Sequence, residues 1–210
     1  MSHDDFEVEP IEGLPERPPT GEQILWQGRP DTLALAREAL NLNWVIGYFA
    51  LLAAWRFISV VDLMPIGQAI GATVPFLLLG AVVCALLYVV ALIQARSTMY
   101  TITSSRIAMR IGAALTLTIN LPYRELGNAA LDLRKNGTGT IALDTTGKTK
   151  ISYLVLWPHA RPWRFGNTQP ALRCIADAEN VARILADAAE ARITTPQVTR
   201  VVPNDAVAAE

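Results

Sequence analysis

Residues 75–93 read PFLLLGAVVCALLYVVALI, and this stretch decides the fold. It is apolar on every face of a helix, and it lies within residues 63–95, a run that has no charged side chain. A bilayer core of about 30 Å takes roughly 20 such residues in helical form. A buried helix of a soluble protein would normally carry a polar stripe. The stretch therefore predicts a membrane-spanning helix.

A second candidate span precedes it. Residues 44–61 read WVIGYFALLAAWRFISVV, with Arg56 as the one charged residue. An arginine at the bilayer centre costs at least ~2.5 kcal/mol. Because Arg56 lies close to the end of the span, we favour snorkelling of its head group over pairing with a partner helix.

The connection and the flanking charges predict the topology. Pro65 and Gly67 suit a tight turn, so residues 44–95 are expected to form a two-span hairpin. Residues 63–75 are either a re-entrant or a periplasmic piece. Arginines flank the hairpin and none lies in its connection, so the positive-inside rule places both termini in the cytoplasm. The flanking arginines are Arg29, Arg37, Arg96, Arg106 and Arg110.

The segment before the hairpin is acidic. Residues 1–43 carry nine acidic and three basic side chains, a net charge of −6. Residues 1–20 are predicted to be disordered, and their acidic, proline-rich start is unlike a secretory signal. Residues 31–43 predict a short amphipathic helix at the membrane interface, capped by Asp31. Its apolar face would consist of Leu33, Ala36 and Leu40.

The segment after the hairpin is basic. Residues 96–175 carry eleven basic and three acidic side chains, a net charge of +8. Anionic lipid attracts such a surface by about 1 kcal/mol for each well-placed basic residue, so anionic membrane lipid is one expected partner. An ordinary solvated basic face explains the charge equally well. Nucleic acid is disfavoured because the charges are scattered without a recognition motif.

This basic segment reads as short strands. Residues 114–121, ALTLTINL, alternate apolar and polar side chains with a period of two. Short strands with regular turns indicate a curled antiparallel sheet. Residues 177–192 then predict an amphipathic helix, capped by Asp177, that closes the sheet. The other expected strands are 99–103, 106–112, 128–134, 140–144 and 148–156.

The predicted fold is therefore a membrane α-helical hairpin plus a β-rich domain, with a curled antiparallel sheet closed by a C-terminal helix. Five parts follow along the chain. They are a disordered acidic N-terminus (1–20), a lead segment with the interfacial helix (21–43), the hairpin (44–95), a cytoplasmic β-domain with its helix (96–192) and a disordered tail (193–210).

Catalytic motifs are missing from the sequence. It contains no HExxH, GxSxG, Walker or GxGxxG pattern, so we expect neither an enzyme nor a bound cofactor. Cys84 and Cys174 lack the spacing of a disulfide framework and are expected to be reduced. His159 is either a ligand for a pigment magnesium or a hydrogen-bonded loop residue, and we favour the second.

The loop 157–170, WPHARPWRFGNTQP, is the candidate partner-binding site. Tryptophan and arginine are enriched at interface hot spots, and prolines stiffen the backbone. The alternative is that both tryptophans pack the sheet against the last helix. The candidate residues are Trp157, His159, Arg161, Trp163 and Arg164.

Two motifs resemble the bacterial pleckstrin-homology (PH)-like membrane proteins. They are GEQILWQGRP (21–30) and YTITSSRIAMRIG (100–112), on either side of the hairpin. Two longer stretches closely resemble the photosynthetic complex assembly proteins of purple bacteria. They are LPYRELGNAALDLRKNGTGTIAL (121–143) and YLVLWPHARPWRFGNTQPALRCI (153–175).

The resemblance implies a PH-like domain in a multi-pass protein of the bacterial inner membrane. It further implies an assembly factor for the photosynthetic reaction centre–light-harvesting 1 core complex, a chaperone that acts by transient binding. Its partners would then be reaction-centre and light-harvesting 1 subunits, and homodimer formation stays open. The alternative is a membrane-anchored lipid- or protein-binding module without a photosynthetic role.

Overall fold

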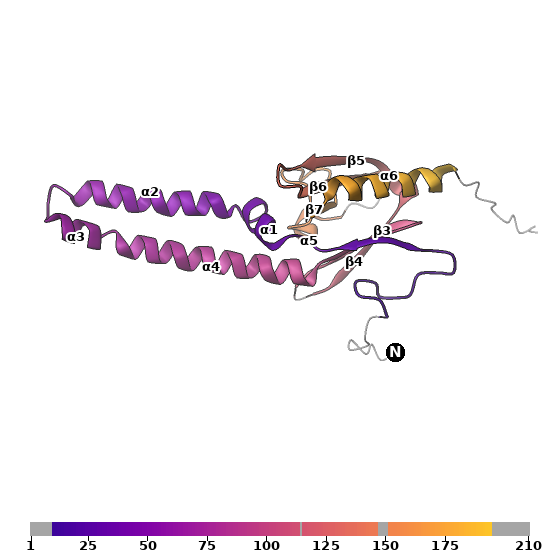
Figure 1. The fold of residues 1–210 in the computed structure, drawn as a ribbon, viewed down its shortest axis with the longest axis horizontal. Helices are drawn as coiled ribbons and strands as arrows, with labels where there is room; N and C mark the ends of the chain where they lie inside the picture. The colour runs from indigo at the N-terminus through magenta and orange to yellow at the C-terminus, as the bar shows by residue number, and fades with distance from the viewer. Residues whose placement is uncertain (1–9, 114, 147–150, 195–210) are drawn as a thin grey trace, which may run out of the picture.

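Two long apolar helices project side by side from a β-rich domain (Figure 1). The computed structural model describes residues 10–113, 115–146 and 151–194. The helices are α2 (Leu42–Val60) and α4 (Val74–Ser97), and the short helix α3 (Ile66–Gly71) lies at the tip between them. By length and composition, residues 42–60 and 66–97 are long and apolar enough to cross a membrane. Most of their side chains face outward, with 11% of each apolar window buried.

Close packing joins the two long helices at one glycine. A Cβ atom added to Gly80 of α4 would lie 2.8 Å from the Cβ of Phe49 in α2. Ala81 and Ala85, two other small residues of α4, face outward. Arg56 is exposed near the end of α2, which is compatible with snorkelling.

The β-domain contains two antiparallel sheets. The first has the order β1-β2-β3-β4, and the second has the order β5-β6-β7. A one-turn 3-10 helix, Tyr123–Glu125, connects the two sheets. The strands are β1 (Ile24–Gly28), β2 (Met99–Thr103), β3 (Arg106–Ile111), β4 (Leu117–Pro122), β5 (Leu126–Leu133), β6 (Gly139–Thr145) and β7 (Ala171–Ile175).

Strand β1 makes the helical hairpin an insertion within a sheet. It pairs antiparallel with β2, so that Gly28 lies opposite Tyr100 although the whole hairpin separates these two residues in the sequence. The carboxylate of Glu22 accepts hydrogen bonds from the Thr103 hydroxyl at 2.6 Å and from Arg106 Nε at 3.0 Å. The two motifs that flank the hairpin therefore bind each other directly.

The structure corrects three sequence predictions. The β-domain does not begin at residue 96, because the lead segment supplies an edge strand. Two sheets replace the single curled sheet. Residues 10–20 were predicted to be disordered, yet Leu14 is 2% exposed and the backbone carbonyl of Glu12 accepts a hydrogen bond from Gln27 of β1. Residues 1–9 and 195–210, also predicted to be disordered, lie outside the described residues.

The structure also differs from the sequence analysis at two places within residues 148–175. Part of the expected strand 148–156 forms the short helix α5 (Tyr153–Leu156), and residues 147–150 lie outside the description. A short apolar run such as YLVL has no periodicity that separates strand from helix. Strand β7 was missed because all five of its residues are buried, so its sequence does not alternate.

Helix α1 (Thr32–Glu38) connects the hairpin to the domain. The Asp31 carboxylate accepts a hydrogen bond from the backbone of Ala34 at 2.7 Å, as expected of a cap. The predicted apolar face is correct for Ala36, which is fully buried, and for Leu40, which packs against the cluster that includes Ala36. It is wrong for Leu33, which is 42% exposed, whereas Leu35 is fully buried. Leu35 packs in a cluster with residues of α4 and β7 instead of lying on a membrane surface.

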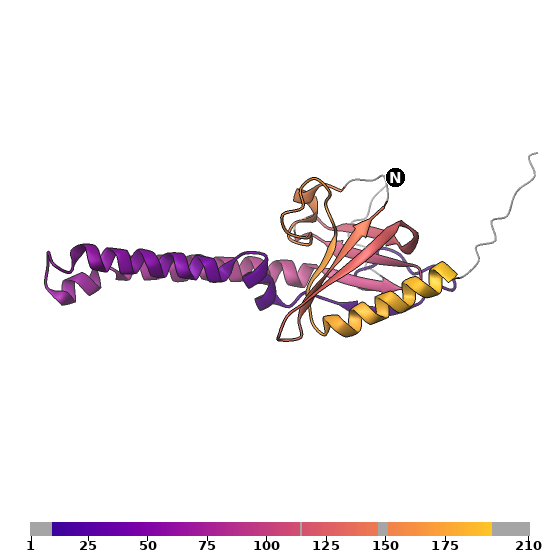
Figure 2. The same ribbon diagram turned by 90° about the horizontal axis from the view of Figure 1, so that it is seen from above.

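The main core lies between the two sheets and helix α6 (Ala178–Thr194) (Figure 2). Its largest fully buried side chains come from both sheets and include Tyr100, Ile107 and Leu143. The helix adds Val181 and Leu185 to the same cluster. No hydrogen bond from the Asp177 side chain to the start of α6 is seen among the described residues; its backbone φ is +49°.

Replacing Gly80 by alanine tests the packing of the hairpin. The added methyl group would clash with the Phe49 Cβ, which cannot move without the backbone, so G80A should lower the melting temperature in detergent. Gly47 of α2 is the matched control, since no atom of the described residues lies within 4 Å of an added Cβ there. G47A should be neutral or stabilising, because alanine favours a helix by up to about 1 kcal/mol over glycine. Equal effects of both changes would contradict the close contact.

Candidate functional site

The predicted partner-binding loop is exposed, on the opposite side of the domain from α6 (Figure 2). Trp163 is 84% exposed and Trp157 is 43% exposed, and neither belongs to the core cluster. The alternative that both tryptophans pack the sheet against the last helix is therefore wrong. Arg164 is exposed, whereas Arg161 is half-buried and donates a hydrogen bond to Gln169 Oε1 at 3.1 Å.

Three further apolar residues extend this exposed surface. Leu154, Val155 and Phe165 are each more than half exposed, and together with Trp157 and Trp163 we call them the aromatic loop surface. The Phe165 ring packs against Tyr153, with 4.7 Å between centroids, and meets Trp163 edge-on at 6.2 Å. Sequence reasoning missed Leu154 and Val155 because they fell in a predicted strand.

Trp163 adopts a strained backbone conformation. Its φ angle is +63°, a region that costs an ordinary L residue about 1–2 kcal/mol. Such strain persists only where the surrounding structure enforces it, and it is concentrated at binding and catalytic sites. The Trp163 side chain is exposed to solvent.

His159, unlike the other predicted residues of the loop, is fully buried. It is 1% exposed, so it does not contact a partner directly, and the partner-binding expectation for it is corrected. One ring nitrogen lies 2.6 Å from the Tyr100 hydroxyl and the other lies 3.0 Å from the Thr98 hydroxyl. Burial, assisted by the charge of Arg173, lowers the pKa of His159 to about 3, so the ring is neutral. This neutral ring joins the loop to the end of α4 and to β2, in keeping with the favoured interpretation.

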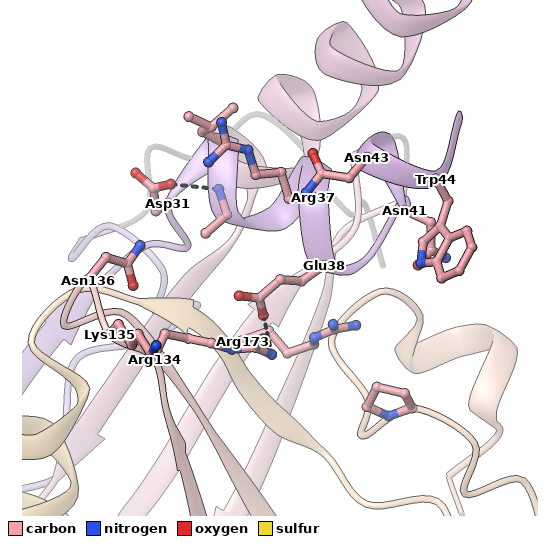
Figure 3. Close-up of a pocket in the computed structure, with 13 residues that line it drawn as sticks. Asp31, Arg37, Glu38, Asn41, Asn43, Trp44, Arg134, Lys135, Asn136 and Arg173 are labelled. Atoms are coloured by element: carbon pink, nitrogen blue, oxygen red, sulfur yellow. Dashed lines mark hydrogen bonds and ion pairs between the residues drawn. The ribbon is translucent and has the colours of Figure 1, made fainter. Parts of the chain in front are cut away.

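A second feature lies where the hairpin meets the domain. A cavity of about 560 Å³ opens between α1, the start of α2 and the turn between β5 and β6 (Figure 3). We call it the junction cavity. Its charged lining consists of Arg37, Arg134, Lys135, Arg173, Asp31 and Glu38.

Glu38 organises one wall of the junction cavity. Its carboxylate lies 3.0 Å from the Arg134 guanidinium, as the dashed line in Figure 3 shows. It also accepts a hydrogen bond from the Cys174 thiol at 3.5 Å. Burial and the nearby Glu38 charge raise the pKa of Cys174 to about 12, so the thiol stays protonated. Cys84 and Cys174 are both free cysteines.

Comparison with known proteins now identifies the family. A model described as "Bacterial PH domain" matches residues 42–189. The chain belongs to the bacterial PH domain family. A protein of Rhodobacter capsulatus, "Uncharacterized 23.7 kDa protein in puhA 5'region", is 46% identical to this chain over 202 residues. The aligned region covers 94% of each of the two proteins. No solved structure matches the present chain.

The family assignment confirms the PH-like character of the domain with its antiparallel sheets. The matched residues include the apolar hairpin, strands β2 to β7 and most of α6, whereas strand β1 lies before them. Within residues 10–113, 115–146 and 151–194, no cluster of histidine, cysteine, aspartate and glutamate is arranged to hold a metal ion.

The neutral state of His159 predicts a loss of stability in acid. Its pKa in the folded protein lies below the ordinary value of 6.5, so unfolded chains take up a proton that folded chains do not. This contribution to the free energy of unfolding is complete above about pH 7, and about 2 kcal/mol of it is lost by pH 5.

Chemical unfolding in detergent at pH 7, 6 and 5 measures the effect. H159Q keeps a polar side chain for Thr98 and Tyr100 but does not titrate, so its stability should change less over this range. If H159Q and the parent protein lose the same free energy between pH 7 and pH 5, the buried neutral histidine is not the cause.

Proposed function

We propose that this protein is a photosynthetic complex assembly factor of the PuhB type. In this proposal it binds reaction-centre and light-harvesting 1 subunits transiently while the core complex is built, and it catalyses no reaction. One observation carries the proposal. A relative that matches nearly the whole chain is named for its position in the 5' region of puhA, which is a photosynthesis-gene context.

The proposed location is the bacterial inner membrane, with both termini in the cytoplasm. Three observations support it. The two long helices have the length and composition of membrane spans. Large apolar side chains cover their outer faces, including Trp44, Leu51 and Leu78. The arginines that flank the hairpin lie at its domain end, which the positive-inside rule assigns to the cytoplasm.

The exposed aromatic loop surface supports a role in binding. A large exposed apolar patch on a folded domain is typical of an interaction site. Trp163 and Arg164 add the residue types that dominate interface energies, on a backbone stiffened by neighbouring prolines. The outward-facing Ala81 and Ala85 offer a second contact surface, because small residues allow close helix approach within a membrane.

A membrane-anchored lipid- or protein-binding module without a photosynthetic role is the second candidate. The basic lining of the junction cavity favours it, since such a site needs no photosynthetic client. Deleting the gene separates the two candidates. Only an assembly factor should lower the amount of core complex while leaving the absorption spectrum of the remaining complexes normal.

Variants of the loop test where the client binds. W163A combined with R164A should reduce core-complex absorbance although the protein accumulates normally in the membrane. Truncating a hot-spot residue costs about 2 kcal/mol, or roughly 30-fold in affinity. The matched control is L25A combined with R183A, which removes one exposed apolar and one exposed basic side chain elsewhere on the domain.

Membrane levels of each variant must be measured together with core-complex absorbance. Normal assembly in the W163A/R164A variant would contradict the loop as the client-binding surface. An equal defect in the control pair would show that the effect is not specific to the loop.

A further inference from the structure

Arg173 is a buried cation in the middle of β7. It is 5% exposed, and its Nη1 group donates a hydrogen bond to the carbonyl of Pro158 at 3.1 Å. Its Nε–H group is buried and has no acceptor among the residues that the structure describes. Within the part of the chain that the structure describes, Arg173 forms no ion pair with a carboxylate.

A buried guanidinium normally requires an anion or a full set of acceptors. It carries five N–H donors and a charge that is strongly unfavourable away from water when unpaired. The two acidic groups of the junction cavity are already engaged. Glu38 pairs with Arg134, and Asp31 caps helix α1. The counter-charge of Arg173 is therefore expected to come from outside the chain.

The junction cavity leads to Arg173 and is positively charged. Four basic and two acidic side chains line it, which leaves a net charge of +2. Its volume of about 560 Å³ lies within the range of roughly 300–1,000 Å³ that is usual for pockets that bind small molecules. Arg37 and Lys135 are exposed at its edge, where they can attract an anion from solution.

The cavity opens where the hairpin leaves the domain. Asn41, Asn43 and Trp44, at the start of α2, form one wall, and Figure 3 shows Trp44 at the end of the cavity away from Asn136. Trp44 is 80% exposed, and tryptophan at the end of an apolar helix is typical of the membrane–water interface. If the hairpin crosses the bilayer as proposed above, the cavity lies at the level of the lipid headgroups.

We propose that the junction cavity binds the phosphate of an anionic membrane lipid headgroup. Arg173 is the buried anchor, because its planar fork matches two phosphate oxygens. Arg37 and Lys135 guide the headgroup from the edge of the cavity. The inference rests on the proposed membrane position of the hairpin and is independent of any photosynthetic client.

Titration of the full-length protein in a neutral detergent tests this site. The probes are dihexanoyl phosphatidylglycerol, dihexanoyl phosphatidylcholine with the same acyl chains, and inorganic phosphate, with binding followed by calorimetry. Phosphatidylglycerol should bind at one saturable site. The other two probes should bind roughly tenfold more weakly, because one has no net charge and the other lacks the glycerol and acyl contacts. If phosphate binds as tightly as phosphatidylglycerol, the site is one for free phosphate and the lipid assignment is overturned.

Variants then place the site. R173M keeps a long buried side chain but removes the charge, so it should weaken phosphatidylglycerol binding roughly tenfold or more at both low and high salt. K135Q should weaken it a few fold at low salt and less at high salt, because exposed charges are screened. R183Q removes an exposed arginine of α6 outside the cavity and should have no effect.

Unchanged phosphatidylglycerol binding by folded R173M would overturn the proposal. If R173M does not fold, as judged by its melting curve, the double variant R37Q/K135Q, changed at two exposed positions, replaces it in the test. Unchanged phosphatidylglycerol binding by that double variant would also overturn the proposal. Absence of phosphatidylglycerol binding in the parent protein also overturns the lipid site. That result would leave the assembly test with W163A and R164A unaffected, so failure of one proposal is distinguishable from failure of the other.

Discussion

The structure depends on the pairing of two segments that the apolar hairpin separates. Glu22 binds Thr103 and Arg106, which lie 81 and 84 positions further along the chain, and strand β1 completes a sheet with β2. Both ends of the hairpin are thereby held within one small domain. The backbone of Asp31 donates a hydrogen bond to the carbonyl of Cys174 at 2.7 Å, which also connects the start of α1 to the second sheet. The hairpin is anchored in the domain at both of its ends and is not merely tethered to it.

This anchoring brings the binding features to the same end of the domain. His159 joins the loop to Thr98 and Tyr100, directly after α4, while Arg173 lies one residue before Cys174 in β7. The backbone N–H of Arg173 also donates to the Tyr100 hydroxyl at 3.3 Å. A ligand in the junction cavity and a protein on the aromatic loop surface would therefore share supporting residues.

The sequence predicted those elements whose pattern is strong and local. The uncharged run over 63–95 and the alternation in ALTLTINL correspond to α4 and β4. Strand β1 was not predicted because five residues, ILWQG, carry little periodicity and its partner lies beyond the hairpin. The exposed tryptophans could be selected by residue type alone, but the burial of His159 depends on Tyr100 and Thr98, which are distant in sequence. For Arg173 one signal was present, a lone cation within the otherwise uncharged strand ALRCI. Only the fold shows that none of the described carboxylates forms an ion pair with it.

The central claim is that a hairpin inserted into a sheet crosses the membrane and returns the chain to the same side. Cysteine labelling with a membrane-impermeant maleimide tests it most directly, in a background where Cys84 and Cys174 are replaced by alanine. Single cysteines are introduced by E16C before the hairpin, D62C at its tip and R183C in α6, all at exposed positions. The account predicts that D62C is labelled only in right-side-out vesicles, and that E16C and R183C are labelled only in inverted vesicles. Labelling of all three from the same side would contradict it.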